Sequence, residues 1–372
     1  MHINALFDGG NIEVVSCANP LSIELNIRKD NQSGFFQWFF FKVYAEKGQD
    51  LVMHIKNAQK ASYPPGWQGY KARYSYDDIH WFQADTDYDG ALNIRHTMQG
   101  YCVSFAYFAP YPLARHQRIL NYAQKHGLRL HCLGKSIQGR SMDLIRAGTG
   151  PLNLWFIARQ HPGETMAEWW MEGVIESLCD PYDPHARALL QKATLHLVPN
   201  MNPDGSFLGN LRTNAVGANL NREWKAPSPE RSPEVLCVRN EMHMTGVDLA
   251  LDVHGDESIP YNFFSGPDGI PSYTQKIQHI YKTFTQLLLD RSPDFQTAYG
   301  YPKTPPGRAN MTVCSNYIAE TFNCVAITIE QPFKDSNITP MPEYGWSPQR
   351  AKHFGAATLR ACAALIEQER LR

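Results

Sequence analysis

Apolar and polar positions follow each other in short runs along the first hundred residues. Between residues 12 and 112, aromatic and β-branched residues form runs that turn residues interrupt, and none has a convincing helical period. The runs lie at residues 12–16, 21–27, 35–43, 51–55, 80–84 and 101–108. Short β-type runs with frequent turns are typical of antiparallel sandwiches and barrels. We therefore expect a small antiparallel β-sandwich domain over residues 1–112.

The pattern changes after residues 109–112. Residues 113–127 place Leu113, Ile119, Leu120 and Tyr122 on one broad side of a helix. Strand-like runs follow at 128–134, 141–148, 152–158, 193–200, 247–254 and 324–330, and helical stretches at 164–179, 272–290 and 349–369. Strands that alternate with helices are typical of α/β proteins. We therefore expect an α/β domain over residues 113–372, with a mixed sheet between helix layers.

Composition and charge narrow the kinds of partner. The 372 residues are 43% apolar and 19% charged, and no window approaches the roughly eighteen consecutive apolar residues of a membrane span. Lys and Arg total 35 against 36 Asp and Glu, which leaves no excess charge for nucleic acid or anionic lipid. We expect neither nucleic acid nor a membrane as a partner, and the oligomeric state stays open.

The start of the chain and its cysteines bear on location. The first residues, MHINALFDGGNIEVV, lack the basic start and apolar run of a secretory signal. The eight cysteines are scattered and form no C-x-x-C pair, which favours buried free thiols. We therefore expect a cytoplasmic protein.

Polar residues follow two of the strand-like runs. In an open α/β sheet, ligands bind beyond the carboxyl ends of the strands. The run 152–158 leads into His161-Pro162-Gly163-Glu164, whose Pro-Gly turn lets His161 and Glu164 point to one spot, and the run 247–254 ends in His254. Two imidazoles and one carboxylate are a set that catalytic zinc uses, with a fourth position left for water. The sequence therefore predicts a zinc site at His161, Glu164 and His254.

These motifs resemble the zinc metallocarboxypeptidases related to carboxypeptidase A and, within them, the cytosolic carboxypeptidases. His161 and Glu164 match the His-x-x-Glu motif of the family, His254 matches its third ligand, and Glu330, at the end of the run 324–330, matches its catalytic glutamate. The aromatic β domain ahead of the peptidase domain also resembles the cytosolic subfamily. The resemblance implies one Zn²⁺ per chain and a mixed, eight-stranded-type sheet between helices, preceded by the β-sandwich.

A long polar stretch between residues 200 and 239 adds residues that do not bind metal. It contains NPDG at 202–205 and NLRTNAVGANLNREW at 210–224, and loops of this length are usually functional or disordered. The resemblance implies that Arg212 polarises the scissile carbonyl, and that Asn221 and Arg222 grip the terminal carboxylate of the substrate. An arginine fork suits this second task, because it binds a carboxylate through paired hydrogen bonds.

The expected activity is removal of C-terminal amino acids from peptides or protein tails by zinc-activated water, with Glu330 as general base. Arg308 lies in the segment 303–317 before the last strand, and a basic residue there would favour an acidic terminal residue such as Glu. Tyr299, Tyr301 and Tyr317 are candidates for a tyrosine that contacts substrate. The alternatives are a zinc amidohydrolase that deacylates N-acyl amino acids and a scaffold without enzyme activity.

Overall fold

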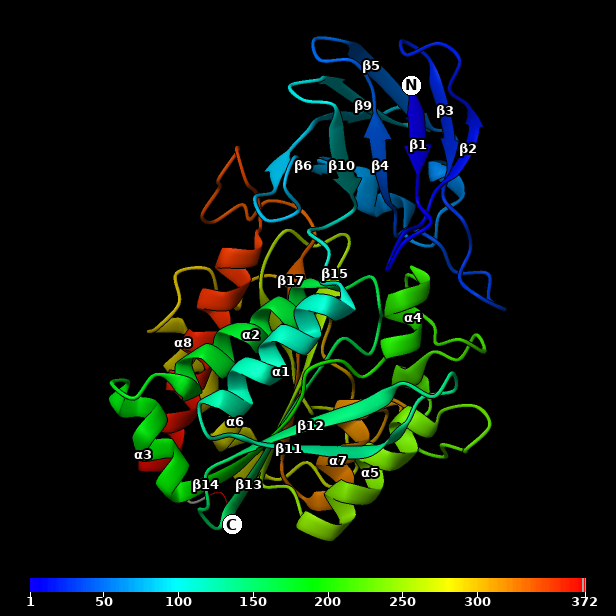
Figure 1. The fold of residues 1–372 in the computed structure, drawn as a ribbon. Coiled ribbons are helices and arrows are strands. Elements are labelled where there is room, and N and C mark those ends of the chain that lie inside the picture. The colour runs from blue at the N-terminus through cyan, green and yellow to red at the C-terminus, as the bar shows by residue number, and fades with distance from the viewer. Residues whose placement is uncertain (370, 372) are drawn as a thin grey trace.

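The computed structural model describes residues 1–369 and 371. Its N-terminal part contains two five-stranded sheets (Figure 1). The first has the order β1 (His2–Asn4), β4 (Phe40–Tyr44), β10 (Cys102–Ala106), β6 (Arg73–Ser75), β7 (Phe82–Gln83). The second has the order β2 (Glu13–Ser16), β3 (Ile23–Asn26), β5 (Asp50–Ile55), β9 (Leu92–Thr97), β8 (Asp85–Tyr88). Short 3₁₀ helices occupy Ala58–Lys60 and Pro64–Trp67.

The two sheets face each other across a buried core, as the apolar runs predicted. The ring of His96 on β9 lies 5.4 Å from that of Phe105 on β10, which joins the sheets. All strand pairs are antiparallel except β3 with β5, which is parallel. Strand β9 escaped prediction because its second half is polar, although Leu92 and Ile94 are fully buried.

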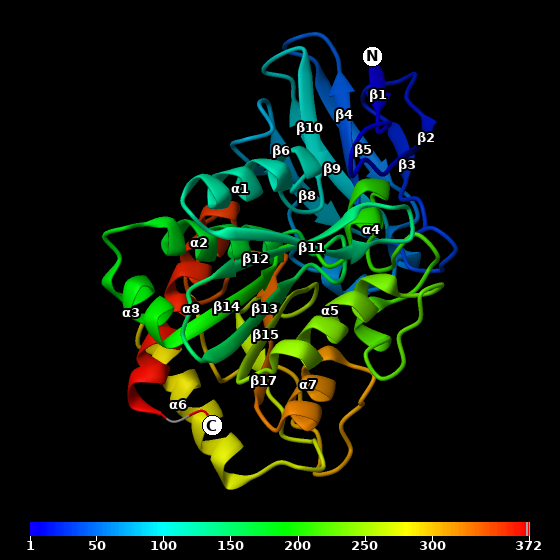
Figure 2. The same cartoon turned by 60° about the horizontal axis from the view of Figure 1, so that its bottom comes forward.

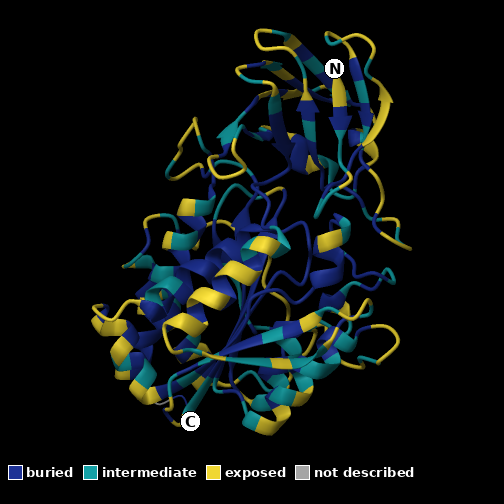
Figure 3. Cartoon of the chain, in the orientation of Figure 1, coloured by how far each residue is buried: buried dark blue, intermediate teal, exposed yellow. Residues whose placement is uncertain are grey.

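The C-terminal part is built on a mixed sheet with helices on both faces. Among the described residues this sheet has seven strands rather than eight. Their order is β11 (Arg129–Lys135), β12 (Ser141–Ala147), β14 (Ala193–Val198), β13 (Leu152–Ala158), β15 (Leu249–Asp256), β17 (Val325–Pro332), β16 (Phe263–Ser265). The four strands β14, β13, β15 and β17 are parallel to one another. Strands β15 and β17 are buried along their whole length (Figure 3), since helices cover both faces.

Two groups of helices cover the sheet. One face carries α1 (Leu113–Lys125), α2 (Met166–Cys179), α3 (Pro184–Lys192), α6 (Gln275–Leu289) and α8 (Pro348–Gln368). The other face carries α5 (Pro233–Thr245) and α7 (Cys314–Phe322), as Figure 2 shows. No helix within the described residues is long and apolar enough to cross a membrane.

The polar stretch 200–239 is more ordered than its composition suggested. It holds α4 (Pro203–Leu208), a 3₁₀ turn at Leu220–Arg222 and the start of α5. Asn202 caps α4, because its side chain accepts a hydrogen bond from the amide of Gly205. Proline opens both α4 and α5. With six residues, α4 is too short to give a periodic signal.

Two strands extend further than the sequence indicated. His254 and Glu330 were expected at strand ends, but β15 and β17 stay paired for two more residues, to Asp256 and Pro332. The N-terminal part lies over this carboxyl end of the sheet (Figure 1). The contact is close, since a Cβ atom on Gly66 would lie 2.9 Å from Cβ of Glu257.

Candidate active site

The turn between β13 and α2 brings two candidate ligands together. Arg159 has a φ of 59°, a left-handed conformation that is uncommon for a side chain of this size. Its guanidinium donates to the carbonyl oxygens of Tyr111 at 2.7 Å and Pro162 at 2.9 Å. The amide of Glu164 donates to the carbonyl of His161 at 3.1 Å. These hydrogen bonds close the turn, so that His161 and Glu164 face the same point.

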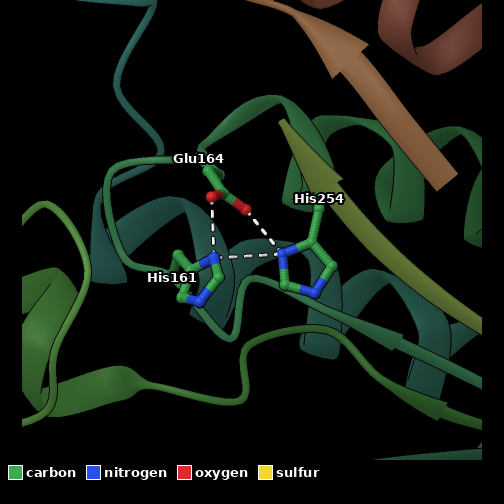
Figure 4. Close-up of side chains that lie close together, drawn as sticks. All are labelled: His161, Glu164 and His254. Carbon is green, nitrogen blue, oxygen red and sulfur yellow. Dashed lines mark hydrogen bonds and ion pairs between the residues drawn. The ribbon is translucent and has the colours of Figure 1, made fainter. Parts of the chain in front are cut away.

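His161, Glu164 and His254 converge as predicted (Figure 4). Nδ1 of His161 lies 2.7 Å from Oε1 of Glu164, and Nδ1 of His254 lies 2.7 Å from Oε2. The two Nδ1 atoms are 3.1 Å apart. In the described part of the chain, this is the one group of His, Cys, Asp and Glu found to bring three ligand atoms within 4.8 Å of one another, and all three residues are buried.

The donor set fits a zinc ion. Zinc bonds of roughly 2.0–2.1 Å in a tetrahedron place neighbouring donor atoms about 3.3 Å apart, close to the separations above. The far nitrogen of each ring also has a partner: Nε2 of His161 lies 3.0 Å from Oδ1 of Asn219, and Nε2 of His254 lies 3.0 Å from Oδ2 of Asp252. Such partners orient histidine ligands, and here they leave both Nδ1 atoms facing the metal position.

Burial and neighbouring charges set the protonation states of the ligands. Burial and the charge of Arg212 lower the pKa of His161 to about 4, which keeps the ring neutral, as a metal ligand must be. Burial alone would raise the pKa of Glu164, but the two histidines outweigh it and lower that pKa. Burial also opposes the charged form of His254, yet Asp252 and Glu164 raise its pKa well above the usual value. These two carboxylates therefore favour a positive charge at this point, which a bound cation supplies.

Glu330 lies beside the ligand group. It stands opposite His254 in the parallel pairing of β15 with β17. Its carboxyl is buried, Oε1 lies 3.3 Å from the hydroxyl of Tyr301, and Oε2 has no partner among the described residues. Burial raises the pKa of Glu330 well above its usual value, and the neighbouring Glu164 and Asp256 add to this. A buried carboxyl with one unpaired oxygen can exchange a proton with a molecule beside it.

A cavity of about 430 Å³ opens over these residues, and Arg212, Asn221 and Arg222 line it. Arg212 is partly buried, and its guanidinium donates no hydrogen bond to any described residue. Oδ1 of Asn221 accepts from the amide of Cys314 at 2.8 Å, and its Nδ2 lies 3.2 Å from Nε2 of His254. Arg222 is exposed and donates to the carbonyl of Asn221 at 2.6 Å. Both arginines thus present charge to whatever enters the cavity.

Not every candidate residue reaches the cavity. Arg308 is exposed and does not belong to its lining. Of the three candidate tyrosines, Tyr301 lines the cavity, and its hydroxyl donates to Oδ2 of Asp256 at 2.6 Å. Tyr299 and Tyr317 lie outside the lining. Of these three candidates, Tyr301 is therefore the one that can meet a substrate.

The sequence did not indicate several residues of this site, among them Asn219 and Asp252 behind the histidines, and Tyr63 and Glu257 in the cavity lining. Asp252 had a local signal, because it stands two residues before His254 in one strand and so shares its face. Tyr63 had none, because it comes from the N-terminal part of the chain.

Comparisons with known proteins identify the family of this chain. Residues 117–352 match the Zinc carboxypeptidase family, and residues 3–108 match the Cytosolic carboxypeptidase N-terminal domain. A crystal structure from Shewanella denitrificans, described as a candidate carboxypeptidase A, is 49% identical with a TM-score of 0.98, and 99% of each chain is covered. A metallo-carboxypeptidase from Pseudomonas aeruginosa, in complex with (2-guanidinoethylmercapto)succinic acid, is 45% identical with a TM-score of 0.98 over all of both chains.

A curated relative is less similar in sequence. Cytosolic carboxypeptidase 6 of Mus musculus is 27% identical over 78% of this chain, which spans 59% of that relative's length. The resemblance seen in the motifs is thus confirmed at the level of family and fold. The chain belongs to the zinc carboxypeptidase family, and it is a metallocarboxypeptidase that carries the N-terminal domain of the cytosolic carboxypeptidases.

Proposed function

We propose that the chain removes C-terminal amino acids from peptides or protein tails, with one Zn²⁺ held by His161, Glu164 and His254. The observation that carries this proposal is the convergence of the three ligand atoms within 4.8 Å, next to a cavity lined by Glu330 and two arginines. Zinc, when bound there, would lower the pKa of water and polarise the scissile carbonyl. The relatives' names support a cytoplasmic location. The separate family matches over residues 3–108 and 117–352 support two domains, at residues 1–112 and 113–372.

Glu330 acts as the general base in this proposal. Its unpaired Oε2 takes the proton of the attacking water and later passes it to the leaving amine. The raised pKa of Glu330, which burial causes, suits a group that must hold that proton between the two transfers. The hydroxyl of Tyr301 lies 3.3 Å from the other carboxyl oxygen.

Arg212 and Arg222 have different roles in this proposal. Arg212 offers free N–H donors to the oxyanion that develops from the carbonyl, where electrostatic help is most effective. Arg222 and Asn221 bind the free terminal carboxylate, and this contact restricts the enzyme to chain ends. The complex of the Pseudomonas aeruginosa relative with a succinic acid, which carries two carboxylates, supports a carboxylate anchor.

Glu330→Gln tests the function. The variant is expected to keep its zinc, because Glu330 is not a ligand, and to lose at least about 100-fold in the rate of amino-acid release. Glu320→Gln is a matched control, since Glu320 is a helix residue outside the cavity lining that accepts hydrogen bonds from Ser272. Zinc content and release from a peptide library are measured side by side. Wild-type activity in Glu330→Gln would refute the assignment.

Substrate comparisons test the finer points. N-acyl amino acids should be poor substrates beside peptides, because the family match does not favour the amidohydrolase alternative. The predicted preference for a terminal Glu depends on Arg308, which is exposed and outside the cavity lining. Turnover of peptides that end in Glu, Lys and Phe decides it, and a preference for Lys or Phe would end that prediction.

A further inference from the structure

The segment that carries Arg212 is tied to the N-terminal part of the chain by one buried carboxylate. The amides of Leu211, Arg212 and Thr213 donate to Asp30 at 2.6, 2.8 and 2.9 Å, and the hydroxyl of Thr213 donates at 3.1 Å. Asp30 is only 3% exposed. Three successive amides that point at one carboxylate fix the direction of the backbone at Arg212.

The side chain of Arg212 also rests on the N-terminal part. Its guanidinium lies 5.5 Å from the ring centre of Phe35 and 5.6 Å from that of Tyr63. Cation–π contacts at this range orient the group without using its N–H donors. Since no described residue hydrogen-bonds to that guanidinium, its donors stay available to the cavity that it lines. The N-terminal part therefore contacts both the backbone amide and the guanidinium of Arg212.

Close backbone contacts fix the rest of the segment. Nδ2 of Asn11 donates to the carbonyl of Gly209 at 2.7 Å, on the N-terminal side of Arg212. On its other side, a Cβ atom at Gly217 would lie 2.4 Å from the carbonyl oxygen of Gln32, so only glycine fits there. Neither end of the segment can shift without breaking a contact to the N-terminal part.

We propose that Asp30, together with the ring of Phe35, is a positioning element that holds Arg212 where the oxyanion forms. The N-terminal part then sets the position of Arg212, in addition to lying beside the cavity. This inference rests on the proposed role of Arg212. A displacement of about 1 Å at such a group can cost on the order of 100-fold in rate.

Asp30→Asn tests the inference, because it keeps the size of the side chain but replaces one acceptor by a donor that faces amides. We expect kcat to fall about 10–100-fold, with KM within about threefold, since Arg222 still binds the terminal carboxylate, and with unchanged zinc content. Asp50→Asn is the matched control. Asp50 is an exposed N-terminal carboxylate that accepts one hydrogen bond, from Thr97, and the control should keep the wild-type kcat.

A double-mutant cycle with Arg212→Ala separates positioning from general damage. If Asp30 acts through Arg212, Asp30→Asn lowers kcat in the wild-type background and has little further effect once Arg212 is absent. An equal loss in both backgrounds, or no loss in the wild type, would overturn the proposal. If Asp30→Asn does not fold, Phe35→Leu replaces it in the double-mutant cycle. Its effect on kcat, with and without Arg212, is then interpreted in the same way. Wild-type activity in Arg212→Ala itself would instead refute the proposed function of Arg212.

Discussion

The rings of His161 and His254 are each held by a polar side chain on the side that faces away from the metal position. For His254 that side chain is Asp252, whose other oxygen accepts a hydrogen bond from Gln160 at 2.7 Å. A carboxylate behind a ligand ring fixes its orientation and raises its basicity. The zinc affinity of this site should therefore depend on residues that do not touch the metal.

Asp252→Asn is expected to weaken zinc binding by about 10–100-fold, because the amide lacks the charge that supports His254. The affinity is measured by competition with a chromophoric chelator. Asp248→Asn serves as a comparison on the same strand run, since Asp248 lies well before His254 and its carboxylate accepts a hydrogen bond from the amide of Asn153. An unchanged zinc affinity in Asp252→Asn would show that the contact does not support the ligand.

Helices α2 and α8 cross at two glycines. Helix α2 is the one that starts just after Glu164, so this crossing supports the turn that carries Glu164. A Cβ atom at Gly173 would lie 2.0 Å from the carbonyl oxygen of Lys352, and one at Gly355 would lie 2.1 Å from that of Trp170. Side chains of any size would push the two helices apart. The close approach therefore requires glycine on both of them.

Gly173→Ala is expected to lower the free energy of unfolding by about 1–3 kcal/mol, because the added methyl overlaps backbone that cannot move cheaply. Gly34→Ala is the control, since Gly34 is exposed and a Cβ there meets nothing within 4 Å. Urea unfolding of both variants checks this. Equal midpoints for the two would contradict the packing argument.

A buried ionic cluster joins α1, α2 and β12 behind the turn that carries His161. His116 lies 2.6 Å from Oε1 of Glu168 and 3.1 Å from Oδ2 of Asp143, and Arg159 donates to Oε2 of Glu168 at 2.7 Å. Burial alone would lower the pKa of His116, but the two carboxylates outweigh it and raise the pKa to about 9. The folded state therefore binds this proton more tightly than the unfolded chain does.

The stability of the protein should fall as pH rises from about 6.5 to about 9. Protonated His116 stabilises the fold in full below the pKa that histidine has in the unfolded chain. This stabilisation is lost as the pH rises through about 9, the pKa of His116 in the folded protein. In His116→Gln that contribution, on the order of 2 kcal/mol, is absent at pH 6 and the stability changes less over this range. Urea unfolding at pH 6 and pH 9 measures it, and the same pH dependence in both proteins would contradict the assignment.

Arg73 crosses the buried interface between the N-terminal and C-terminal parts of the molecule, here called the seam. The guanidinium of Arg73, on β6, donates to the carbonyl oxygens of Phe333 at 3.0 Å and Trp346 at 3.4 Å in the C-terminal part. Arg73 is 1% exposed, and burial lowers its pKa. Its hydrogen bonds link the sheets above the cavity to the segment that follows β17.

Arg73→Met is expected to lower the free energy of unfolding by about 2–4 kcal/mol, because buried carbonyls lose a charged donor. Arg95→Met, which removes an exposed partner of Asp87, should cost no more than about 1 kcal/mol. Urea unfolding followed by fluorescence and by circular dichroism compares the two. A similar loss in both would mean that the seam contributes little.

Much of the molecule was predictable because its signals are local. The apolar runs predicted the strands β13, β15 and β17, and the H-P-G-E turn predicted that the side chains of His161 and Glu164 meet. Short polar helices such as α4 and the strand β9 were missed, since their burial comes from distant residues. The extension of β15 past His254 was also missed, because strand length depends on the partner strand.

The alternation of strands and helices, the candidate ligands His161, Glu164 and His254, and the family resemblance were all readable from the chain, because each depends on residue types within short local motifs. Three facts required the folded chain: Tyr301 lines the cavity, Arg308 lies outside its lining, and Asp30 reaches the segment of Arg212. These facts depend on contacts between residues far apart in the chain. Such contacts are set by how whole layers pack, and no local pattern encodes them.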